Sequence, residues 1–197
     1  MNTVKLGDIC DLMTGGTPSR SHSEYFKDGN IKWLVSGDIN KGEIEDCDGR
    51  ITTLGLKHSN ARILPINSVM IALNGQGKTR ASVAMLRTEA TCNQSLVSIY
   101  PKDDTKVLPE FIYWNLRGRY QELRRLTGDS GTERRGLNMI IIRNIDIPTP
   151  PSLEQQQRII HKLKDTFGKI DQIASLTQEK LQELENLKQA VLIEAYS

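Results

Sequence analysis

Three prolines in four positions, Pro148, Pro150 and Pro151, divide the chain into two unlike parts. Proline fixes φ and has no backbone N–H, so this segment cannot lie inside a helix or a central strand. Ser152 follows at once, and Gln155 stands three positions later, which is the spacing of a helix capping box. No proline occurs after this point. We therefore predict one domain over residues 1–150 and a long helix within residues 151–197.

An apolar stripe runs along one side of the predicted C-terminal helix. Its residues recur at spacings of three and four positions and their multiples, which is typical of a helix that packs on a partner. Forty-odd helical residues make a rod of roughly 65 Å, too long to be covered by a domain of about 150 residues. We therefore predict that the helix pairs with another helix through Leu163, Phe167, Ile170, Leu181, Leu184 and Val191.

The first 150 residues have a different pattern. Short apolar runs at residues 31–35, 68–73, 82–86 and 96–99 are separated by Gly, Asn, Pro and Asp, and such runs indicate strands. One amphipathic segment, residues 109–126, has helical spacing and a proline suited to a first turn. The predicted fold class is α+β, a mixed α/β domain followed by a long helix.

Composition places the chain among globular proteins, because 38% of its residues are hydrophobic and 25% are charged. No stretch reaches signal-peptide or membrane-span length, so we expect a cytoplasmic protein without membrane contact. Cys10, Cys47 and Cys92 are odd in number and lack C-x-x-C spacing, and the three histidines are scattered. We expect buried reduced thiols, with no disulfide framework, no metal site and no bound cofactor.

An acidic turn at residues 43–48 is the only grouping that suggests a cation site, and a solvated loop explains it as well. Formal net charge is only +2, but the distribution of charge is uneven. A local positive patch is formed by six arginines within nineteen residues, namely Arg117, Arg119, Arg124, Arg125, Arg134 and Arg135.

Residues 74–79 (NGQGKT) end like a phosphate-binding loop and follow a predicted strand. Ala72 stands where that motif has its first glycine, and the segment after Thr79 lacks the helical period that the motif requires. A polar hairpin tip carrying Lys78 and Arg80 is the better interpretation. The motifs of metalloproteases, α/β-hydrolases and dinucleotide-binding enzymes are absent from the sequence, so we predict no catalytic residues.

Nucleic-acid recognition needs phosphate-binding Lys and Arg together with polar side chains on loops that reach base edges. Three loops offer them, at residues 14–20, 74–80 and 128–138. For backbone contacts we predict Arg20, Lys78, Arg80, Arg134 and Arg135, and for base edges Asn74, Gln76 and Asn138. Solvent-exposed turns would have the same composition, and the arginines of residues 109–126 also suit the solvated face of a helix.

Several stretches together resemble the specificity subunits of type I restriction-modification systems. The opening of a target-recognition domain in that family is similar to residues 5–9 (KLGDI), 15–19 (GGTPS) and 31–39 (IKWLVSGDI). Its central strands resemble residues 68–78 and 90–95, and its closing run resembles residues 131–132, 137–138 and 145–148. The start of its conserved helical region resembles residues 150–159 (PPSLEQQQRI).

This resemblance implies a non-catalytic reader of double-stranded DNA that docks methyltransferase subunits and, in the full complex, restriction subunits. S-adenosylmethionine, ATP and Mg²⁺ would belong to those partners. The family normally has two recognition domains and two helical regions whose helices pack antiparallel, whereas one of each is present here, as in a half-length form. The resemblance therefore implies an intermolecular antiparallel coiled coil and a homodimer.

Two other interpretations remain open at this point. A coiled-coil DNA or RNA binder could act without methyltransferase partners. A nucleotide hydrolase could use Lys78, and it would be recognised by nucleotide binding to the isolated protein.

Overall fold

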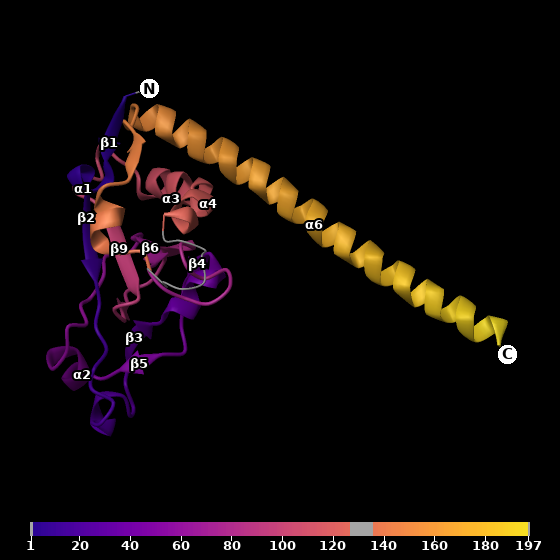
Figure 1. The fold of residues 1–197 in the computed structure, drawn as a ribbon, viewed down its shortest axis with the longest axis horizontal. Coiled ribbons are helices and arrows are strands. Elements are labelled where there is room, and N and C mark those ends of the chain that lie inside the picture. Colours follow the sequence, from indigo (N-terminus) through magenta and orange to yellow (C-terminus); the bar gives the residue numbers. More distant parts are fainter. Residues whose placement is uncertain (1, 127–135, 197) are drawn as a thin grey trace. The chain divides into compact units, whose positions relative to one another are not determined.

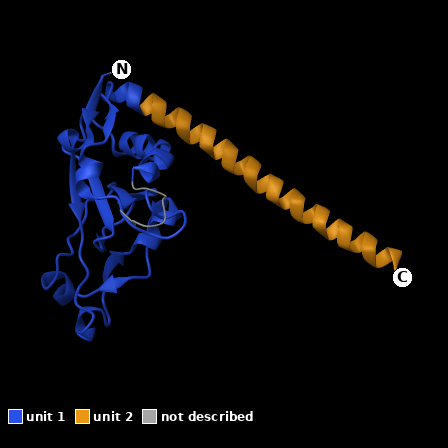
Figure 2. Ribbon diagram, in the orientation of Figure 1, with its two compact units in different colours: residues 1–156 blue, residues 157–197 orange. Residues whose placement is uncertain are grey.

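A computed structural model describes residues 2–126 and 136–196. The chain divides into two compact units, residues 1–156 and 157–197 (Figure 2). The first unit thus ends at Gln156, a few residues beyond the proline-rich segment. The assignment of residues 1–150 to target recognition and of residues 151–197 to helix pairing stays a prediction.

The described residues form short strands, short helices and one long helix (Figure 1). The strands are β1 (Thr3–Lys5), β2 (Cys10–Thr14), β3 (Ile31–Leu34), β4 (Glu43–Ile44), β5 (Arg50–Ile51), β6 (Val69–Ala72), β7 (Val83–Leu86), β8 (Thr91–Cys92), β9 (Leu96–Pro101) and β10 (Asp146–Pro148). The α-helices are α1 (Leu6–Ile9), α2 (Thr53–Lys57), α3 (Pro109–Gly118), α4 (Tyr120–Arg125), α5 (Met139–Arg143) and α6 (Leu153–Ala195), and the 3-10 helices are η1 (Ser23–Tyr25) and η2 (Ser36–Lys41).

A five-stranded sheet in the order β2-β9-β6-β7-β4 forms the centre of the first unit. Its pairings are antiparallel except that β4 runs parallel to β7. All four residues of β6 and of β7 are buried, and α3 packs against both strands, which explains why these runs are apolar without alternation. The strands predicted at residues 31–35, 68–73, 82–86 and 96–99 are confirmed.

Two smaller sheets complete the first unit. β3 pairs antiparallel with β5 and parallel with β8, and β1 pairs antiparallel with β10, which brings the N-terminal strand beside residues 146–148. One core cluster joins the five-stranded and three-stranded sheets and contains Leu34, Met70 and Cys92, all fully buried. Mixed sheets with a long helix after them confirm the predicted α+β class.

The helix predicted over residues 109–126 is divided in two. α3 ends at Gly118 and α4 begins at Tyr120, with Arg119 between them at φ −97° and ψ 10°. Glycine destabilises a helix by about 1 kcal/mol relative to alanine, so Gly118 is a favourable place for the interruption. The prediction of one continuous helix was therefore wrong. Phe111 and Leu123 of the predicted apolar face are buried as expected, whereas Leu126 at its end is exposed.

The helix predicted after Ser152 is confirmed as α6, with 43 residues. The Ser152 hydroxyl oxygen accepts a long hydrogen bond from the backbone N–H of Gln155 at 3.4 Å, as its position at the helix start predicts. From Ile170 onward its apolar side chains are exposed, including Leu181 at 55% and Leu184 at 57%. None of the described helices combines the length and the apolar character that a membrane span requires.

Candidate nucleic-acid interface

The loop of residues 74–80 is the tip of the hairpin that joins β6 to β7. These strands are antiparallel, with Ile71 opposite Val83, and the backbone N–H of Ala81 donates to the carbonyl of Ala72 at 3.0 Å. The hairpin interpretation is confirmed. A phosphate-binding loop needs a helix after it, and a strand follows instead, so this structure contradicts the motif that residues 74–79 partly match.

Glycines give this hairpin tip its conformation. Gly77 has a φ of +58°, in the left-handed region where a side chain costs roughly 1 kcal/mol. Gly75 has a φ of +153°, and a Cβ added there would clash with the side chain of Thr79. In the 74–80 loop, Asn74, Gln76 and Lys78 are exposed, and Arg80 is partly buried.

The base of the 74–80 loop contacts a segment that lies far away in the sequence. The backbone N–H of Leu137 donates to the carbonyl of Leu73 at 3.0 Å, and Gly136 lies so close that an added Cβ would overlap the side-chain oxygen of Asn74. The structure therefore brings two of the three predicted loops together. Arg134 and Arg135 lie outside the described residues.

Asn138 has a structural role beside that contact. Its side-chain oxygen accepts a hydrogen bond from the backbone N–H of Ile141 at 2.9 Å and so caps the first turn of α5. The oxygen is thus engaged by the protein, and the part of Asn138 in base recognition stays a prediction.

Two hollows lie beside the 74–80 loop. The first, of about 450 Å³, is lined by Asn74, Gly75, Gln76, Gly77, Arg80, Arg124 and Gly136. The second, of about 400 Å³, is lined by Ile39, Asn40, Gly42, Lys78, Ala81, Ser82, Val83, Tyr113, Arg117 and Tyr120. Three predicted residues, Asn74, Gln76 and Arg80, therefore line one hollow together, and Lys78 lines the other.

Arg117 and Arg124 line these hollows although we did not select them from the sequence. The density of arginine between residues 117 and 135 was the available signal, but a solvated helix face explained it equally well. Arg117 lies over the rings of Tyr113 and Trp114, with its guanidinium carbon 5.8 and 5.0 Å from the ring centres. Stacking of this kind fixes an arginine while leaving it charged.

Arg20 lies on a different part of the first unit. The segment before it is held by strands β3 and β8, because Gly16 donates to the carbonyl of Cys92 at 2.9 Å and accepts from the Trp33 indole at 3.0 Å. Thr17 also donates to the side-chain oxygen of Gln94 at 2.7 Å. Arg20 is exposed and lines neither of the two hollows, so its contact with DNA stays a prediction.

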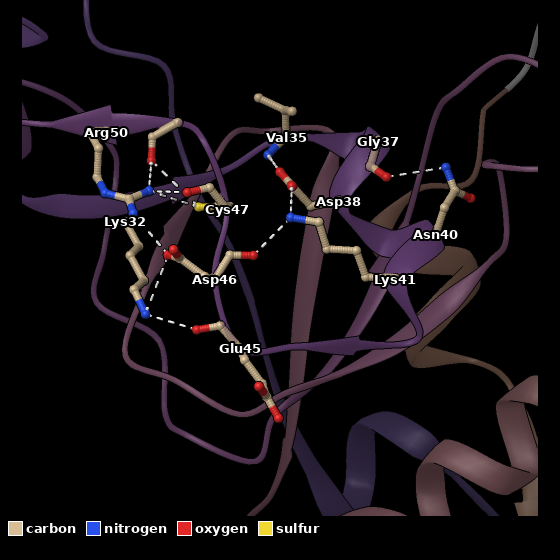
Figure 3. A network of polar contacts seen from close by, with 11 residues as sticks. Lys32, Val35, Gly37, Asp38, Asn40, Lys41, Glu45, Asp46, Cys47 and Arg50 are labelled. Carbon is tan, nitrogen blue, oxygen red and sulfur yellow. Dashed lines mark hydrogen bonds and ion pairs between the residues drawn. The ribbon is translucent and has the colours of Figure 1, made fainter.

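The acidic turn at residues 43–48 is bound by basic side chains (Figure 3). Asp46 forms ion pairs with Arg50 at 2.8 Å and with Lys32 at 3.5 Å, and its carbonyl accepts from Lys41 at 2.8 Å. A backbone hydrogen bond from Cys47, followed by the nearby charges of Arg50 and Lys32, lowers the pKa of Asp46. Among the described residues, no cluster of His, Cys, Asp or Glu is placed to hold a metal ion.

The same network extends to η2, where Asp38, Asn40 and Lys41 lie (Figure 3). Asp38 accepts from the backbone N–H of Val35 at 2.9 Å and pairs with Lys41 at 3.1 Å. Asn40, in the same short helix, donates to the carbonyl of Gly37 at 3.1 Å and to the hydroxyl of Thr79 at 3.2 Å. The bond from Asn40 thus joins η2 to one side of the 74–80 loop.

These features define a class of protein: a mixed α/β domain that exposes amide and basic side chains on a braced hairpin tip, followed by a helix with an exposed apolar stripe. The family model for the type I restriction modification DNA specificity domain matches residues 1–186, and the chain belongs to this family.

The chain is 27% identical over 182 residues to the specificity subunit of the Escherichia coli type I restriction enzyme EcoR124I/EcoR124II. That match covers 91% of the chain and 43% of the relative, so the chain spans less than half of that protein's length.

Two solved structures share the fold. One comes from work on the complex assembly and conformational transition of the type I restriction-modification system. The match has a TM-score of 0.76 and 20% identity, and it covers all of this chain and 45% of that chain. The HsdS subunit from Thermoanaerobacter tengcongensis has a TM-score of 0.63 and 18% identity, over 86% of this chain and 38% of its own.

Proposed function

We propose that the chain reads one half of a bipartite DNA target, pairs with a second copy through α6, and docks methyltransferase and restriction subunits without catalysing a reaction itself. Membership of the specificity family supports DNA recognition. The partners and the divided target are inferred from the family resemblance, since the chain spans less than half of the relative that it matches.

The observation that carries the reading role is the composition of the first hollow. Asn74 and Gln76 supply amide groups that can both donate to and accept from base edges, and Arg80 and Arg124 supply positive charge beside them. Lys78 is exposed on the same hairpin and suits a phosphate oxygen. Base-reading and backbone-binding groups thus stand together on one braced loop.

The observation that supports pairing is the exposed apolar surface of α6. A groove of about 550 Å³ on this helix is lined by Leu181, Leu184, Glu185, Leu187, Lys188, Val191 and Leu192. The second unit consists of this helix alone, so it has no core of its own in which to bury these side chains. A second copy is the proposed partner, because one stripe becomes complementary to itself in an isologous dimer.

A twofold dimer has a direct consequence for the target. Its axis must coincide with a twofold axis of the DNA, so identical domains require identical half-sites in opposite orientation. Selection of binding sites from random double-stranded DNA, with the methyltransferase subunit present, tests the proposal. An enriched inverted repeat with a fixed spacer is expected, whereas no enrichment of any sequence, or two unlike half-sites, would contradict it.

The selection needs a control that separates reading from charge. The Asn74→Ala and Gln76→Ala double variant retains every basic side chain, so it should still bind DNA but enrich a less defined sequence. A site identical to that of the unchanged protein would show that these amides are not the reading groups.

A further inference from the structure

Two side chains of helix α4 donate hydrogen bonds to backbone carbonyls of the 74–80 loop. The Arg124 guanidinium donates to the carbonyl of Gly77 at 2.7 Å, and the Tyr120 hydroxyl donates to the carbonyl of Lys78 at 3.0 Å. The two α4 side chains also contact each other, since Arg124 donates to the Tyr120 hydroxyl at 3.1 Å. Its guanidinium carbon lies 5.5 Å from the centre of the Tyr120 ring. We call this arrangement the α4 clamp.

The groups that form this contact use their hydrogen-bonding capacity. The Lys78 carbonyl accepts a second hydrogen bond from the Ser82 hydroxyl at 2.6 Å, so both of its lone pairs are engaged. The Tyr120 hydroxyl both donates and accepts. Because the donor to Gly77 is a charged guanidinium, that bond is stronger than one between neutral groups.

The carbonyls that the clamp holds lie where the loop is most free to change. Gly77 has the left-handed φ of +58°, and an added Cβ there would meet nothing within 4 Å; Gly75 lies two residues before it. Glycine loses more conformational freedom on ordering than any other residue. Without the clamp, fewer contacts would hold this tip before DNA binds.

The clamp also separates the two hollows. Gln76 and Arg80 line the first hollow together with Arg124, whereas Lys78 lines the second together with Tyr120. A change in the peptide between Gly77 and Lys78 would alter which hollow each side chain lines. The hydrogen bond to the Gly77 carbonyl fixes that peptide, and the bond to the Lys78 carbonyl fixes the next one, between Lys78 and Thr79.

We propose that Tyr120 and Arg124 are positioning residues, which hold the 74–80 loop in its reading conformation before DNA arrives and thereby set sequence discrimination. The effect on sequence discrimination rests on the proposed function, whereas the hold on the loop does not. The arrangement of the free loop can be tested without DNA. Arg124 acts through its hydrogen bond to the Gly77 carbonyl, and Lys78 acts as the phosphate contact.

Hydrogen exchange of the whole chain without DNA tests the clamp directly. Arg124→Met keeps an unbranched stem beside the Tyr120 ring but removes the donors, and Tyr120→Phe removes only a hydroxyl. Both should accelerate amide exchange in residues 74–80 while leaving exchange in β6 and β7 unchanged. Arg125→Met, at the exposed neighbouring position of the same helix, is the matched control and should change nothing.

DNA binding then separates positioning from a phosphate contact. Affinity falls as salt rises, and loss of one phosphate contact reduces the magnitude of the slope of log affinity against log salt by about 0.9. This is the expected result for Lys78→Ala. Tyr120→Phe should leave that slope unchanged but lower affinity for the selected site roughly tenfold, because the loop must be ordered on binding. Affinity for unrelated DNA should stay within about twofold of the original value, since contacts to phosphates do not depend on sequence.

The outcomes distinguish this inference from the proposed function. Unchanged exchange in residues 74–80 for both α4 variants would overturn the clamp, whether or not the protein reads DNA. A lower salt slope for Arg124→Met, with unchanged exchange, would make Arg124 a phosphate contact instead. If the unchanged protein showed no sequence preference, the proposed function would fail while the exchange result still stood.

Discussion

The side-chain oxygen of Gln156 accepts a hydrogen bond from the backbone N–H of Leu108 at 2.9 Å, across 48 residues of sequence. Its amide nitrogen donates to the carbonyls of Lys106 at 2.7 Å and Pro151 at 2.8 Å. Gln156 is fully buried, so these bonds replace water for every polar atom of its side chain. They join the first turn of α6 to the segment that leads into α3.

Replacing Gln156 should destabilise the first unit strongly. Gln156→Ala leaves a buried N–H and two carbonyls without this partner, and we expect the free energy of unfolding to fall by about 2 to 4 kcal/mol. Gln157→Ala is the matched control, because Gln157 is the exposed next residue, and a change below about 0.5 kcal/mol is expected for it. Urea unfolding of both variants measures the difference, and equal stabilities would refute the structural role of Gln156.

The sequence could not distinguish Gln156 from its neighbours. Gln155, Gln156 and Gln157 form one polar run in which only helical phase and the position of the preceding chain decide which residue is buried. The acceptor and donor partners of Gln156 are backbone atoms, and a pattern of side chains does not encode them. The start of the helix was predictable from Ser152, whereas the long-range contact was not.

Gly15 is expected to tolerate no side chain. An added Cβ would overlap the carbonyl oxygen of Cys92, which already accepts the backbone N–H of Gly16. Backbone on β8 would have to move, so Gly15→Ala should lower the free energy of unfolding by about 3 kcal/mol. Gly37→Ala has open space around the added methyl group and serves as the control, with little change in the midpoint of thermal unfolding.

Buried thiols should make stability depend on alkaline pH. Burial raises the pKa of Cys92 from 9.0 to about 12, and burial likewise raises the pKa of Cys10 to about 12. Both thiols stay protonated in the folded protein while they ionise in the unfolded chain. Their contribution is therefore complete below pH 9.0 and is lost as the pH rises toward about 12.

Comparison with Cys92→Ala isolates one of these thiols. Each should add a slope of about 1.4 kcal/mol per pH unit to the fall in stability between the two pKa values. The variant should therefore lose stability less steeply than the original protein, even if it is less stable at neutral pH. Identical slopes in urea unfolding would show that Cys92 ionises equally easily in both states.

Much of the fold was predictable because its longer elements carry strong periodic signals. The strands around Val69, Val83 and Leu96 and the helix after Ser152 lie where the apolar patterns place them. Strand order was not predictable, since β4 and β8 have two residues each and too few positions to show a period. Their parallel pairing with β7 and β3 depends on the packed core.

The candidate interface was predictable in part for a similar reason. The composition of residues 74–80 indicated an exposed polar loop, and the structure brings Asn74, Gln76 and Arg80 to one hollow. Arg124 contacts a backbone carbonyl 47 residues away, so its sequence position alone gave no indication of that role.

Charge on the apolar stripe of α6 should abolish the proposed homodimer. Leu181→Lys together with Leu184→Lys would bury two ammonium groups without partners in the paired helices, a penalty of several kcal/mol each that pairing cannot offset. Sedimentation should then show a monomer with an intact first unit. Gln182→Lys together with Asn186→Lys adds the same charge to exposed positions away from the stripe, so this variant should remain dimeric. A dimer that persists in the first variant would place the interface elsewhere, and a monomeric unchanged protein would exclude pairing through α6.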